Sequence, residues 1–344
     1  MTLLLNYRPV LRQPTGIGVY ANAVLPALQK LPHHLISGGE EGTARQRIRR
    51  LAWSQLALPQ LALRHDAALI FTPAPEGYLG PQRIPQLVMV HDLRPLSHPE
   101  RSAQSLYFRY WVPSLLRSCQ HVLTNSLFTA REIQRLVGLT DNQISVIPLG
   151  YDKNLFRPRL MESRSVGVSY FLHVGQPYPH KNIERLLQAF ATVASRYPKV
   201  QLMLVGKPHR SESPRLHALV REQGLAHRVI FRSYVSASDL PALYQGALAF
   251  VFPSLWEGFG LPVLEAMACG APVITSLGSG TEEVAGDAAI LVDPLNVNAL
   301  EEALESVIEQ PFLCEQLRRS GLKRASQFCW DLAAEKTAEI CQRI

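Results

Sequence analysis

The hydrophobic positions in the second half of the chain follow two alternating patterns. Short, nearly continuous apolar runs, as over 170–174 and 200–205, are typical of strands that are buried on both faces of a sheet. Between them, apolar residues recur at helical spacing, as over 183–193. Strands and helices that alternate in this way indicate parallel βαβ units. Further strands are expected over 228–231, 247–253 and 273–275, and further helices over 216–223, 239–246 and 263–268.

The first half of the chain repeats this alternation less regularly. Helical patterns lie between most of its apolar runs, so it also predicts an α/β fold. Residues 148–169 then follow with two prolines, polar side chains and little periodicity, which favours a linker. The strands of the first half are expected over 3–5, 67–71, 86–90, 121–123 and 144–147.

The length of the chain fits two domains better than one. A chain of 344 residues is long for one hydrophobic core and comfortable for two. We therefore expect two Rossmann-like, doubly wound α/β domains that face each other across a cleft lined by strand-to-helix loops. The expected first domain covers 1–155, the linker 156–169, and the second domain 170–328, while a helix over 329–344 could return to the first domain.

Composition and charge narrow the class of protein. The chain has no signal-peptide pattern and no apolar stretch near the ~20 residues of a membrane helix, so a cytoplasmic protein is expected. Its five cysteines are widely spaced and form no Cys-x-x-Cys pair, which argues against a disulfide framework or a zinc site. The net charge of +7 suits anionic partners, namely nucleotide diphosphates, anionic lipids or nucleic acid.

The strongest chemical signal is the segment 252–270, which reads FPSLWEGFGLPVLEAMACG. A buried strand ends near Phe252, a loop with two glycines follows, and a helix is expected to begin with Pro262 at its first position. Free backbone N–H groups at the start of a helix form a phosphate-binding device. Gly258 and Gly260 would let the backbone approach a ligand closely.

Two carboxylates flank this loop. Glu257 lies in the loop and could reach a polar ligand beyond the phosphates, while Glu265 lies one turn into the helix and could accept hydrogen bonds from a diol such as a ribose. Either residue alone is as well explained by a solvated loop or by a favourable charge in a first helical turn. Both together, in a strand, glycine loop and proline-led helix, favour a ligand site.

At this point the chain resembles a known family. The pattern PSxxEGFGLPxxEAMAxG, with its two glutamates, is similar to the signature of the family 4 retaining glycosyltransferases of the GT-B fold. The resemblance runs nearly from end to end. Further matching pieces, in the family's order, are PTGIG at 14–18, His91-Asp92, PLGYD at 148–152, the stretch from His173-Val-Gly175 to Lys181-Asn182, GTEEVAGD at 280–287, and Trp330.

The resemblance implies roles for individual residues. Glu257 would contact the donor sugar, Lys181 would neutralise the leaving diphosphate, and His91 would lie by the sugar hydroxyls and the acceptor, so these three are the expected catalytic residues. Many relatives carry an arginine where this chain has His180 or Gln176. The expected donor-binding residues are Gly16, Gly18, Gly175, Gly258, Phe259, Gly260, Leu261 and Glu265, with the backbone N–H groups of Phe259, Gly260 and Leu261 facing the sugar and diphosphate.

The resemblance also implies a reaction. A hexose, with mannose favoured, would move with retention from a nucleotide diphosphate sugar to a glycan, lipid-linked or small-molecule acceptor, and GDP-mannose is favoured over UDP-sugars as the donor. The chain contains no Asp-x-Asp, the usual carboxylate pair for a metal bound to a nucleotide sugar. No metal ligand and no other cofactor is therefore expected.

A basic stretch suggests a membrane contact. Arg45, Arg47, Arg49 and Arg50 alternate with apolar residues up to Leu56, which could form an interfacial helix at an anionic membrane. A solvated basic face on a core helix explains the stretch equally well. Peripheral association with the inner face of a membrane is therefore an alternative to a purely cytoplasmic location.

Three other functions fit parts of the sequence less well. A sugar-nucleotide epimerase would share the two-domain cleft, although the two-glutamate motif argues against it. An NAD-dependent oxidoreductase would use Gly16 to Ala21, which fit G-x-G-x-x-A, but these residues begin ten positions after Asn6, too far for a tight turn off the first strand. A nucleic-acid binder lacks basic-aromatic interleaving and zinc-ligand spacing, so nucleic acid is not an expected partner.

Overall fold

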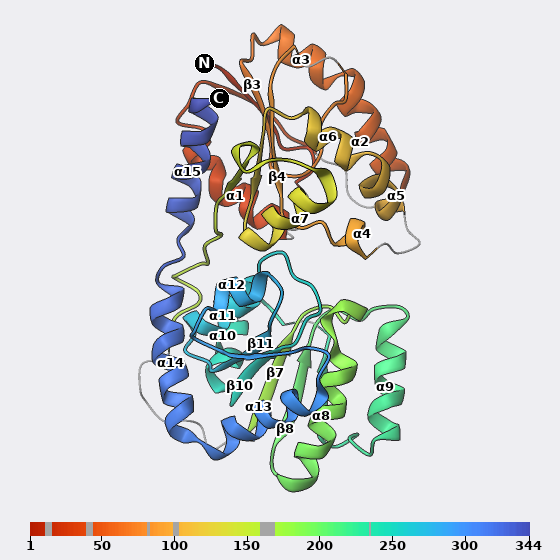
Figure 1. Cartoon of the computed structure of the whole chain (residues 1–344), viewed down its shortest axis with the longest axis vertical. Helices are drawn as coiled ribbons and strands as arrows, with labels where there is room; N and C mark the ends of the chain where they lie inside the picture. The colour runs from red at the N-terminus through yellow and green to blue at the C-terminus, as the bar shows by residue number, and fades with distance from the viewer. Residues whose placement is uncertain (11–15, 39–43, 81–82, 99–102, 159–168, 234) are drawn as a thin grey trace. The chain divides into compact units, whose positions relative to one another are not determined.

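The computed structural model divides the chain into two compact units, each with its own parallel sheet (Figure 1). Unit 1 comprises Met1–Gly150 and Cys329–Ile344, and unit 2 comprises Tyr151–Phe328. The structure describes residues 1–10, 16–38, 44–80, 83–98, 103–158, 169–233 and 235–344. Most of the expected linker over 156–169 lies outside these ranges.

The sheet of unit 1 has six parallel strands in the order β2-β1-β3-β4-β5-β6. It contains the strands that the sequence predicts and also β2, which it does not. In β2, His33 and His34 interrupt the apolar pattern because this strand lies at the edge of the sheet and is partly exposed. The strands are β1 (Leu3–Asn6), β2 (His33–Ile36), β3 (Leu69–Thr72), β4 (Gln86–Val90), β5 (His121–Thr124) and β6 (Ile144–Val146).

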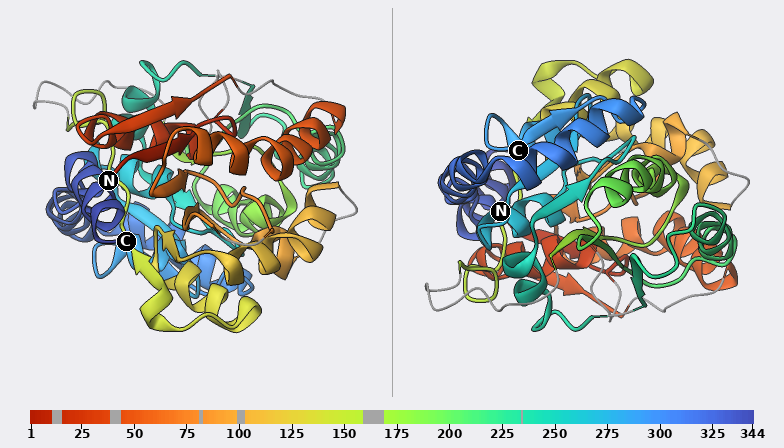
Figure 2. Two further views of the ribbon diagram at one scale, coloured as in Figure 1. Left: turned by 90° about the horizontal axis from the view of Figure 1, so that it is seen from above. Right: turned by 90° about the horizontal axis from the view of Figure 1, so that it is seen from below.

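Helices cover both faces of this sheet (Figure 2). On one face, residues of β4 and β5 pack with α5 to α7, and residues of β1 and β3 pack with α3. Elsewhere in the unit, α1 and α15 lie side by side, and the hydroxyls of Tyr20 and Thr337 are 3.2 Å apart. The helices are α1 (Gly16–Leu28), α2 (Ala44–Leu56), α3 (Leu58–Arg64), α4 (Arg94–Ser97), α5 (Ala103–Tyr110), α6 (Val112–Ser118), α7 (Leu127–Val137) and α15 (Trp330–Arg343), with a 3-10 turn η1 (Asp141–Gln143).

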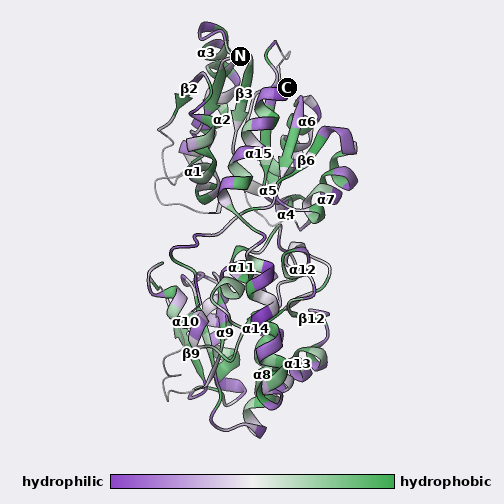
Figure 3. Ribbon diagram, turned by 90° about the vertical axis from the view of Figure 1, so that its left-hand side faces the viewer, coloured by the Kyte–Doolittle hydropathy of each residue, from purple (hydrophilic) through white to green (hydrophobic). Residues whose placement is uncertain are grey.

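The sheet of unit 2 also has six parallel strands, in the order β12-β11-β10-β7-β8-β9. Its strands are apolar almost throughout, and Figure 3 shows the hydrophobic colour concentrated in the strands of both units. The three-residue strand β12 is too short to show a period, so the sequence does not predict it. The strands are β7 (Tyr170–Val174), β8 (Gln201–Val205), β9 (Val229–Arg232), β10 (Ala249–Phe252), β11 (Val273–Ser276) and β12 (Ile290–Val292).

Two groups of helices pack on the two faces of the unit 2 sheet. Residues of α8, α9 and α13 form one continuous core with the strands, while α10 and α11 contact β7, β10 and β11, and α11 also packs on α14. This is the doubly wound α/β arrangement expected from the sequence. The helices are α8 (Ile183–Arg196), α9 (Glu212–Glu222), α10 (Leu240–Gly246), α11 (Leu261–Ala268), α12 (Gly280–Ala285), α13 (Val297–Glu309) and α14 (Pro311–Ala325), with a 3-10 turn η2 (Pro179–Lys181).

The chain leaves unit 1 and re-enters it at adjacent points. A Cβ atom on Gly150 would lie 2.2 Å from the backbone nitrogen of Trp330, so only glycine fits at the exit beside the start of α15. Just beyond this exit, Phe156 is buried in unit 2, where its ring lies 6.2 Å from that of Tyr244.

Candidate functional site

The strand order of unit 2 places the candidate site at a topological switch point. The sheet starts at β7 in its middle, continues to β8 and β9 on one side, and then continues to β10, β11 and β12 on the other. In open α/β sheets, ligands bind outside the carboxyl ends of the strands where the order reverses. The turn that follows β7 carries Lys181, and the loop that follows β10 carries Glu257.

Lys181 and Glu257 form an ion pair at this point. Nζ of Lys181 lies 2.5 Å from Oε1 of Glu257, and the two side chains are only 15% and 16% exposed. The same ammonium group lies 4.7 Å from the ring centroid of Phe252 at the end of β10. Gly175 is part of this group, because a Cβ on it would lie 3.7 Å from Cε of Lys181. Three of the predicted site residues are therefore brought together.

Asn182 fixes the turn that carries Lys181. It adopts the left-handed conformation, with φ of 59°, which asparagine tolerates better than most residues. Its side-chain amide donates hydrogen bonds to the carbonyl oxygens of Pro253 at 3.0 Å and Pro294 at 2.6 Å. His180 adds a backbone link, since its carbonyl accepts a hydrogen bond from Leu255 N at 2.7 Å. The sequence gives Asn182 only as a neighbour of Lys181, and its anchoring role emerges from the fold.

The glycine loop leaves backbone donors free at the start of α11. Gly260, with φ of 111°, caps the helix, and its carbonyl accepts hydrogen bonds from the N–H groups of Val263 and Leu264. Within the described part of the chain, the N–H groups of Phe259, Gly260 and Leu261 donate no hydrogen bond. These are the three donors that the sequence predicts to face a sugar diphosphate.

Two details of α11 differ from the prediction. The helix begins at Leu261, so Pro262 occupies the second position and not the first. Proline is tolerated there for the same reason, since the first N–H groups of a helix have no partner within it. The side chain of Phe259 is used for packing, with its ring 5.9 Å from that of Phe328.

The glycine loop over 257–260 packs closely against the start of α12. Gly280 N donates a hydrogen bond to the carbonyl of Glu257 at 2.9 Å. A Cβ on Gly280 would lie 2.3 Å from the carbonyl oxygen of Gly258, and one on Gly260 would lie 2.8 Å from Cγ2 of Thr281. Glycine at 280 is therefore required for close approach of the two backbones.

Glu265 projects from α11 into a largely apolar surrounding. Burial raises the pKa of its carboxyl group to about 7, and a hydrogen bond from Tyr244 opposes this shift. Tyr244 Oη lies 3.2 Å from Oε2 of Glu265. Burial, followed by the charge of Glu265, raises the pKa of Tyr244 well above its usual range, so the phenol keeps its proton and donates it.

A buried histidine lies beneath the ion pair. The ring of His173, in β7, stacks on Phe252 at 5.4 Å, and its Nδ1 lies 3.0 Å from the carbonyl of Val251. Burial, with a smaller contribution from the charge of Lys181, lowers the pKa of His173 to about 4 against the opposing effect of the hydrogen bond to Val251, so the ring is neutral at pH 7. Nδ1–H therefore donates to Val251, and Nε2 has no hydrogen-bonding partner in the structure.

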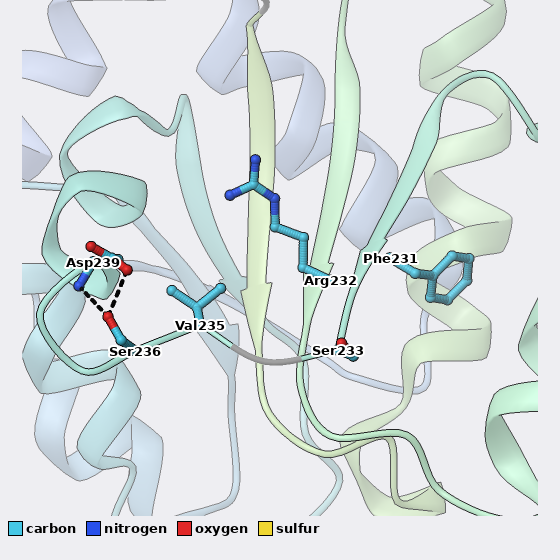
Figure 4. Close-up of a pocket in the computed structure, with 6 residues that line it drawn as sticks. All are labelled: Phe231, Arg232, Ser233, Val235, Ser236 and Asp239. Atoms are coloured by element: carbon cyan, nitrogen blue, oxygen red, sulfur yellow. Dashed lines mark hydrogen bonds between the residues drawn. The ribbon is translucent and has the colours of Figure 1, made fainter.

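A shallow hollow of about 640 Å³ lies at the same edge of the sheet, beyond the carboxyl end of β9 (Figure 4). Asp239 is held in its wall by Ser236, whose hydroxyl donates to Oδ2 at 2.6 Å. Figure 4 shows Phe231 directed away from Asp239, on the other side of the strand from Arg232. The hollow is lined by Phe231, Arg232, Ser233, Val235, Ser236 and Asp239.

In unit 1, His91 follows β4 and meets residues that follow β1 and β3. Its Nε2 lies 3.2 Å from the carbonyl of Pro73, and its ring lies 5.2 Å from that of Tyr20 in an edge-on contact. Burial lowers the pKa of His91 to about 4. The neutral ring thus donates through Nε2, and Nδ1 is left as an acceptor. Beside it, Oδ1 of Asp92 accepts a hydrogen bond from Arg94 N at 3.0 Å.

The predicted N-terminal glycine loop is only partly described. Pro14 and Thr15 lie outside the described residues, and Gly16 and Gly18 belong to the first turn of α1 and not to a loop. Gly16 is exposed, whereas Gly18 is buried. Both glycines and His91 lie in unit 1, while Lys181, Glu257 and Glu265 lie in unit 2.

The basic stretch forms α2, but its arginines differ in their surroundings. Arg50 makes two hydrogen bonds to the carboxylate of Glu76, at 2.8 and 2.7 Å, and is therefore committed to a contact within unit 1. Ile48 is 66% exposed and Leu56 is 70% exposed. The side chains of Arg45 and Arg47 lie outside the described part of the structure.

The described residues show neither a metal-binding cluster nor a membrane-spanning helix. They contain no group of three or more histidine, cysteine, aspartate or glutamate side chains arranged to hold a metal ion. None of their helices combines the length and the apolar character needed to cross a bilayer.

Comparison with known proteins identifies the family. Residues 15–155 match the family described as "Glycosyltransferase Family 4", and residues 162–324 match "Glycosyl transferases group 1". The chain belongs to the glycosyltransferases of family 4 type with the GT-B fold, as its motifs predict, and it is a glycosyltransferase. This membership favours sugar transfer over the oxidoreductase and epimerase alternatives.

Characterised relatives and a solved structure agree with this assignment. The chain is 33% identical to O-antigen chain mannosyltransferase B of Escherichia coli over 84% of this chain and 76% of the relative. It is 32% identical to O-antigen chain mannosyltransferase RfbU of Salmonella typhimurium over 66% of this chain but only 62% of that relative. A sucrose-phosphate synthase from Thermosynechococcus elongatus has the same fold, with a TM-score of 0.79 at 22% identity over 100% of this chain and 98% of that one.

Proposed function

We propose that this glycosyltransferase moves a hexose, mannose in the first instance, from a nucleotide diphosphate sugar to a glycan or lipid-linked acceptor with retention of configuration. The two relatives are O-antigen chain mannosyltransferases, which supports mannose as the sugar and a polysaccharide as the product. GDP-mannose is the proposed donor, in preference to UDP-sugars.

One observation carries the proposal. The paired Lys181 and Glu257 lie at the switch point of the unit 2 sheet, next to three backbone N–H groups at the start of α11 that have no partner among the described residues. A cation and the positive end of a helix suit a diphosphate, and a carboxylate suits sugar hydroxyls. We assign the diphosphate to Lys181 and to the N–H groups of 259–261, and the sugar hydroxyls to Glu257.

The remaining residues complete the assignment. Glu265 would accept hydrogen bonds from the ribose hydroxyls, and the hollow beyond β9 is a place for the outer part of the nucleotide along the same edge of the sheet. His91, as a neutral acceptor, would receive a hydrogen bond from a hydroxyl of the donor sugar or of the acceptor.

The proposed chemistry needs no protein base. In a front-face displacement, the acceptor hydroxyl forms the new bond to the anomeric carbon while the bond to the phosphate oxygen breaks, and the leaving phosphate takes the acceptor's proton. Lys181 and the N–H groups of 259–261 would stabilise the charge that develops on that phosphate. We propose that these groups act without a metal ion. A transfer assay in the presence of EDTA tests this directly, and activity should be retained.

A lipid-linked acceptor would bring the chain to a membrane surface. Exposed Ile48 and Leu56 lie on α2, whose sequence is rich in arginine, and such a helix suits an anionic lipid surface. We propose peripheral association through this helix. Liposome flotation tests it: binding should require anionic lipid and fall in Ile48→Asp, and binding that depends on neither contradicts it.

Transfer assays with a panel of donors test the function as a whole. We expect turnover with GDP-mannose above that with UDP-glucose or UDP-N-acetylglucosamine, and an α-linked product visible by NMR. Glu257→Ala should abolish transfer with the fold retained, Lys181→Ala should slow turnover, and Glu265→Ala should mainly weaken nucleotide binding. Absence of binding to any nucleotide sugar would overturn the proposal.

A further inference from the structure

Tyr244 is a fully buried residue of α10 whose only polar atom meets the carboxylate of Glu265. Its side chain is 0% exposed. The ring makes edge-on contacts with Phe156 at 6.2 Å and with Phe250 at 5.3 Å. These contacts fix the ring, and the ring fixes the position of the hydroxyl, 3.2 Å from Oε2 of Glu265.

This hydrogen bond uses one of the two oxygens of Glu265. In the described residues, the Glu265 side chain has no other hydrogen-bonding partner, so Oε1 is available. A carboxylate is a pure acceptor, and the phenol is the donor. A tyrosine at this position therefore does more than fill the core, since phenylalanine would fill nearly the same volume and leave Oε2 without a partner.

In the proposed function, Glu265 binds the ribose of the donor, and the inference about its hydrogen bond with Tyr244 rests on that function. We infer that Tyr244 is a positioning residue that holds the Glu265 carboxylate in place, leaving its second oxygen to accept a hydrogen bond from a ribose hydroxyl of the donor. Tyr244 itself does not touch the donor. It acts only through Glu265.

The ionisation of Glu265 makes this role measurable. Because burial raises the pKa of Glu265 to about 7 and the Tyr244 hydrogen bond lowers it, removal of the hydroxyl should raise that pKa. Cys269, which caps the C-terminal end of α11, also interacts with this pair. On the helices that pack against α11, Glu282 of α12 accepts a hydrogen bond from Gly278 N, and Arg324 of α14 donates to the carbonyls of Glu283 and Val284.

The experiment compares ribose recognition with and without the hydroxyl of Tyr244. Dissociation constants are measured for GDP and for its 2′-deoxy and 3′-deoxy forms, with the uridine series in parallel. In the wild type, removal of the ribose hydroxyl that donates a hydrogen bond to Glu265 should weaken binding about tenfold. This loss corresponds to the free energy of one hydrogen bond to a charged group. In Tyr244→Phe this ratio should fall below about threefold, and the rise of GDP affinity with pH near 7 should move to higher pH.

A double-mutant comparison separates positioning from packing. Tyr244→Phe combined with Glu265→Gln should bind GDP as Glu265→Gln alone does, because the tyrosine acts through the glutamate. Tyr197→Phe is the matched control. The hydroxyl of Tyr197 also donates to a carboxylate, that of Glu309, but on the exposed surface of unit 2. This control should leave every ratio unchanged.

The outcomes separate this inference from the proposed function. If the wild type binds neither nucleotide series, or Glu265→Gln keeps full ribose discrimination, then the assigned donor site is wrong and the inference falls with it. If the wild type and Glu265→Gln behave as expected but Tyr244→Phe keeps the wild-type ratio and pH profile, the inference alone is overturned. Thermal unfolding of Tyr244→Phe verifies that the variant is folded.

Discussion

Lys181 and Glu257 neutralise each other across 2.5 Å. The turn after β7 supplies the cation and the loop after β10 supplies the carboxylate, and less than a fifth of each side chain is exposed. Both residues are assigned here to different parts of one donor. A bound donor would therefore exchange this ion pair for two new contacts, one to phosphate and one to sugar.

The ion pair should weaken the binding of a nucleoside diphosphate that lacks the sugar. Such a ligand competes with Glu257 for Lys181, but it has no donor-sugar hydroxyl to donate a hydrogen bond to Glu257. We expect Glu257→Gln to bind GDP roughly three to ten times more tightly than the wild type, since a partly buried charge pair contributes about 1 kcal/mol. The same variant should lose transferase activity. Isothermal titration with GDP and a transfer assay measure the two effects.

Glu184→Gln serves as the control for this experiment. Glu184 is paired with Arg215 on the exposed surface of unit 2, so its neutralisation changes the net charge by the same amount away from the site. Its affinity for GDP should match that of the wild type. Unchanged or weaker GDP binding by Glu257→Gln would show that the pair does not compete with phosphate.

Gly280→Ala should displace the glycine loop. Its Cβ would lie 2.3 Å from the carbonyl oxygen of Gly258, a backbone atom that can yield only if the loop moves. A shift of about 1 Å in such a loop can cost about a hundredfold in turnover. We expect a loss of that size in kcat/KM, measured by transfer assay, in a folded protein.

Gly278→Ala separates steric overlap from backbone strain. Gly278 has φ of 76°, and no atom lies within 4 Å of a Cβ placed on it. This variant should lose about 1–2 kcal/mol of unfolding free energy through left-handed strain and keep its activity. Equal activity losses in the two variants would rule out the steric explanation.

Two substitutions at Asn182 should differ in cost. Asn182→Gly removes the hydrogen bonds to Pro253 and Pro294 but accepts the φ of 59°, so it should lower the unfolding free energy by about 2 kcal/mol. Asn182→Ala adds strain of about 1 kcal/mol. Denaturant titration measures both, and turnover should fall in both because the Lys181 turn loses its anchor. Equal stability of the two variants would mean that the turn relaxes.

The neutral state of His173 should make its contribution to stability depend on pH. With a folded pKa of about 4 against an ordinary value of 6.5, the unfolded chain binds a proton in this window that the folded chain does not. The contribution is therefore complete above pH 6.5 and is lost as pH falls towards 4, by about 3 kcal/mol in total.

The difference in unfolding free energy between wild type and His173→Asn isolates this effect. Glu265 has the opposite dependence, because its raised pKa costs stability as pH rises from 4.5 to about 7, but its contribution cancels in the difference. We expect the difference to shrink steadily from pH 6.5 to 4.5 in denaturant titrations. A difference that stays constant over this range would mean that His173 is protonated in the folded chain.

The parts of the fold that follow from local pattern could be predicted from the sequence. The apolar runs of β4 and β7 give the observed bounds, because buried central strands are mostly apolar, with Gln86 and His173 as the polar exceptions. The edge strand β2 has no such run, since His33 and His34 are tolerated where one side of the strand is open. The left-handed residues and close backbone approaches have no period, and apart from glycines they leave no trace in the sequence.

The candidate site was predictable where its chemistry lies on loops. Glu257 stands out in the glycine loop that follows a buried strand, whereas Lys181 is assigned only through the family resemblance. The structure brings the two together across 76 residues of sequence. Tyr244 does not stand out, because it occupies a core position in an apolar helix and only its contact with Glu265 distinguishes it. Long-range pairs of this kind depend on the register of packed helices, which a single sequence does not contain.

The close contact between Gly150 and Trp330 has a consequence for how the protein can be re-engineered. The chain leaves unit 1 for unit 2 and returns to unit 1 at neighbouring points, so in topology unit 2 is an insertion into unit 1. Exchange of the segment 151–328 between family members therefore places both joints at one small region of the chain. Both joints of such a chimera fall where the backbones already touch, and glycine must be kept at 150.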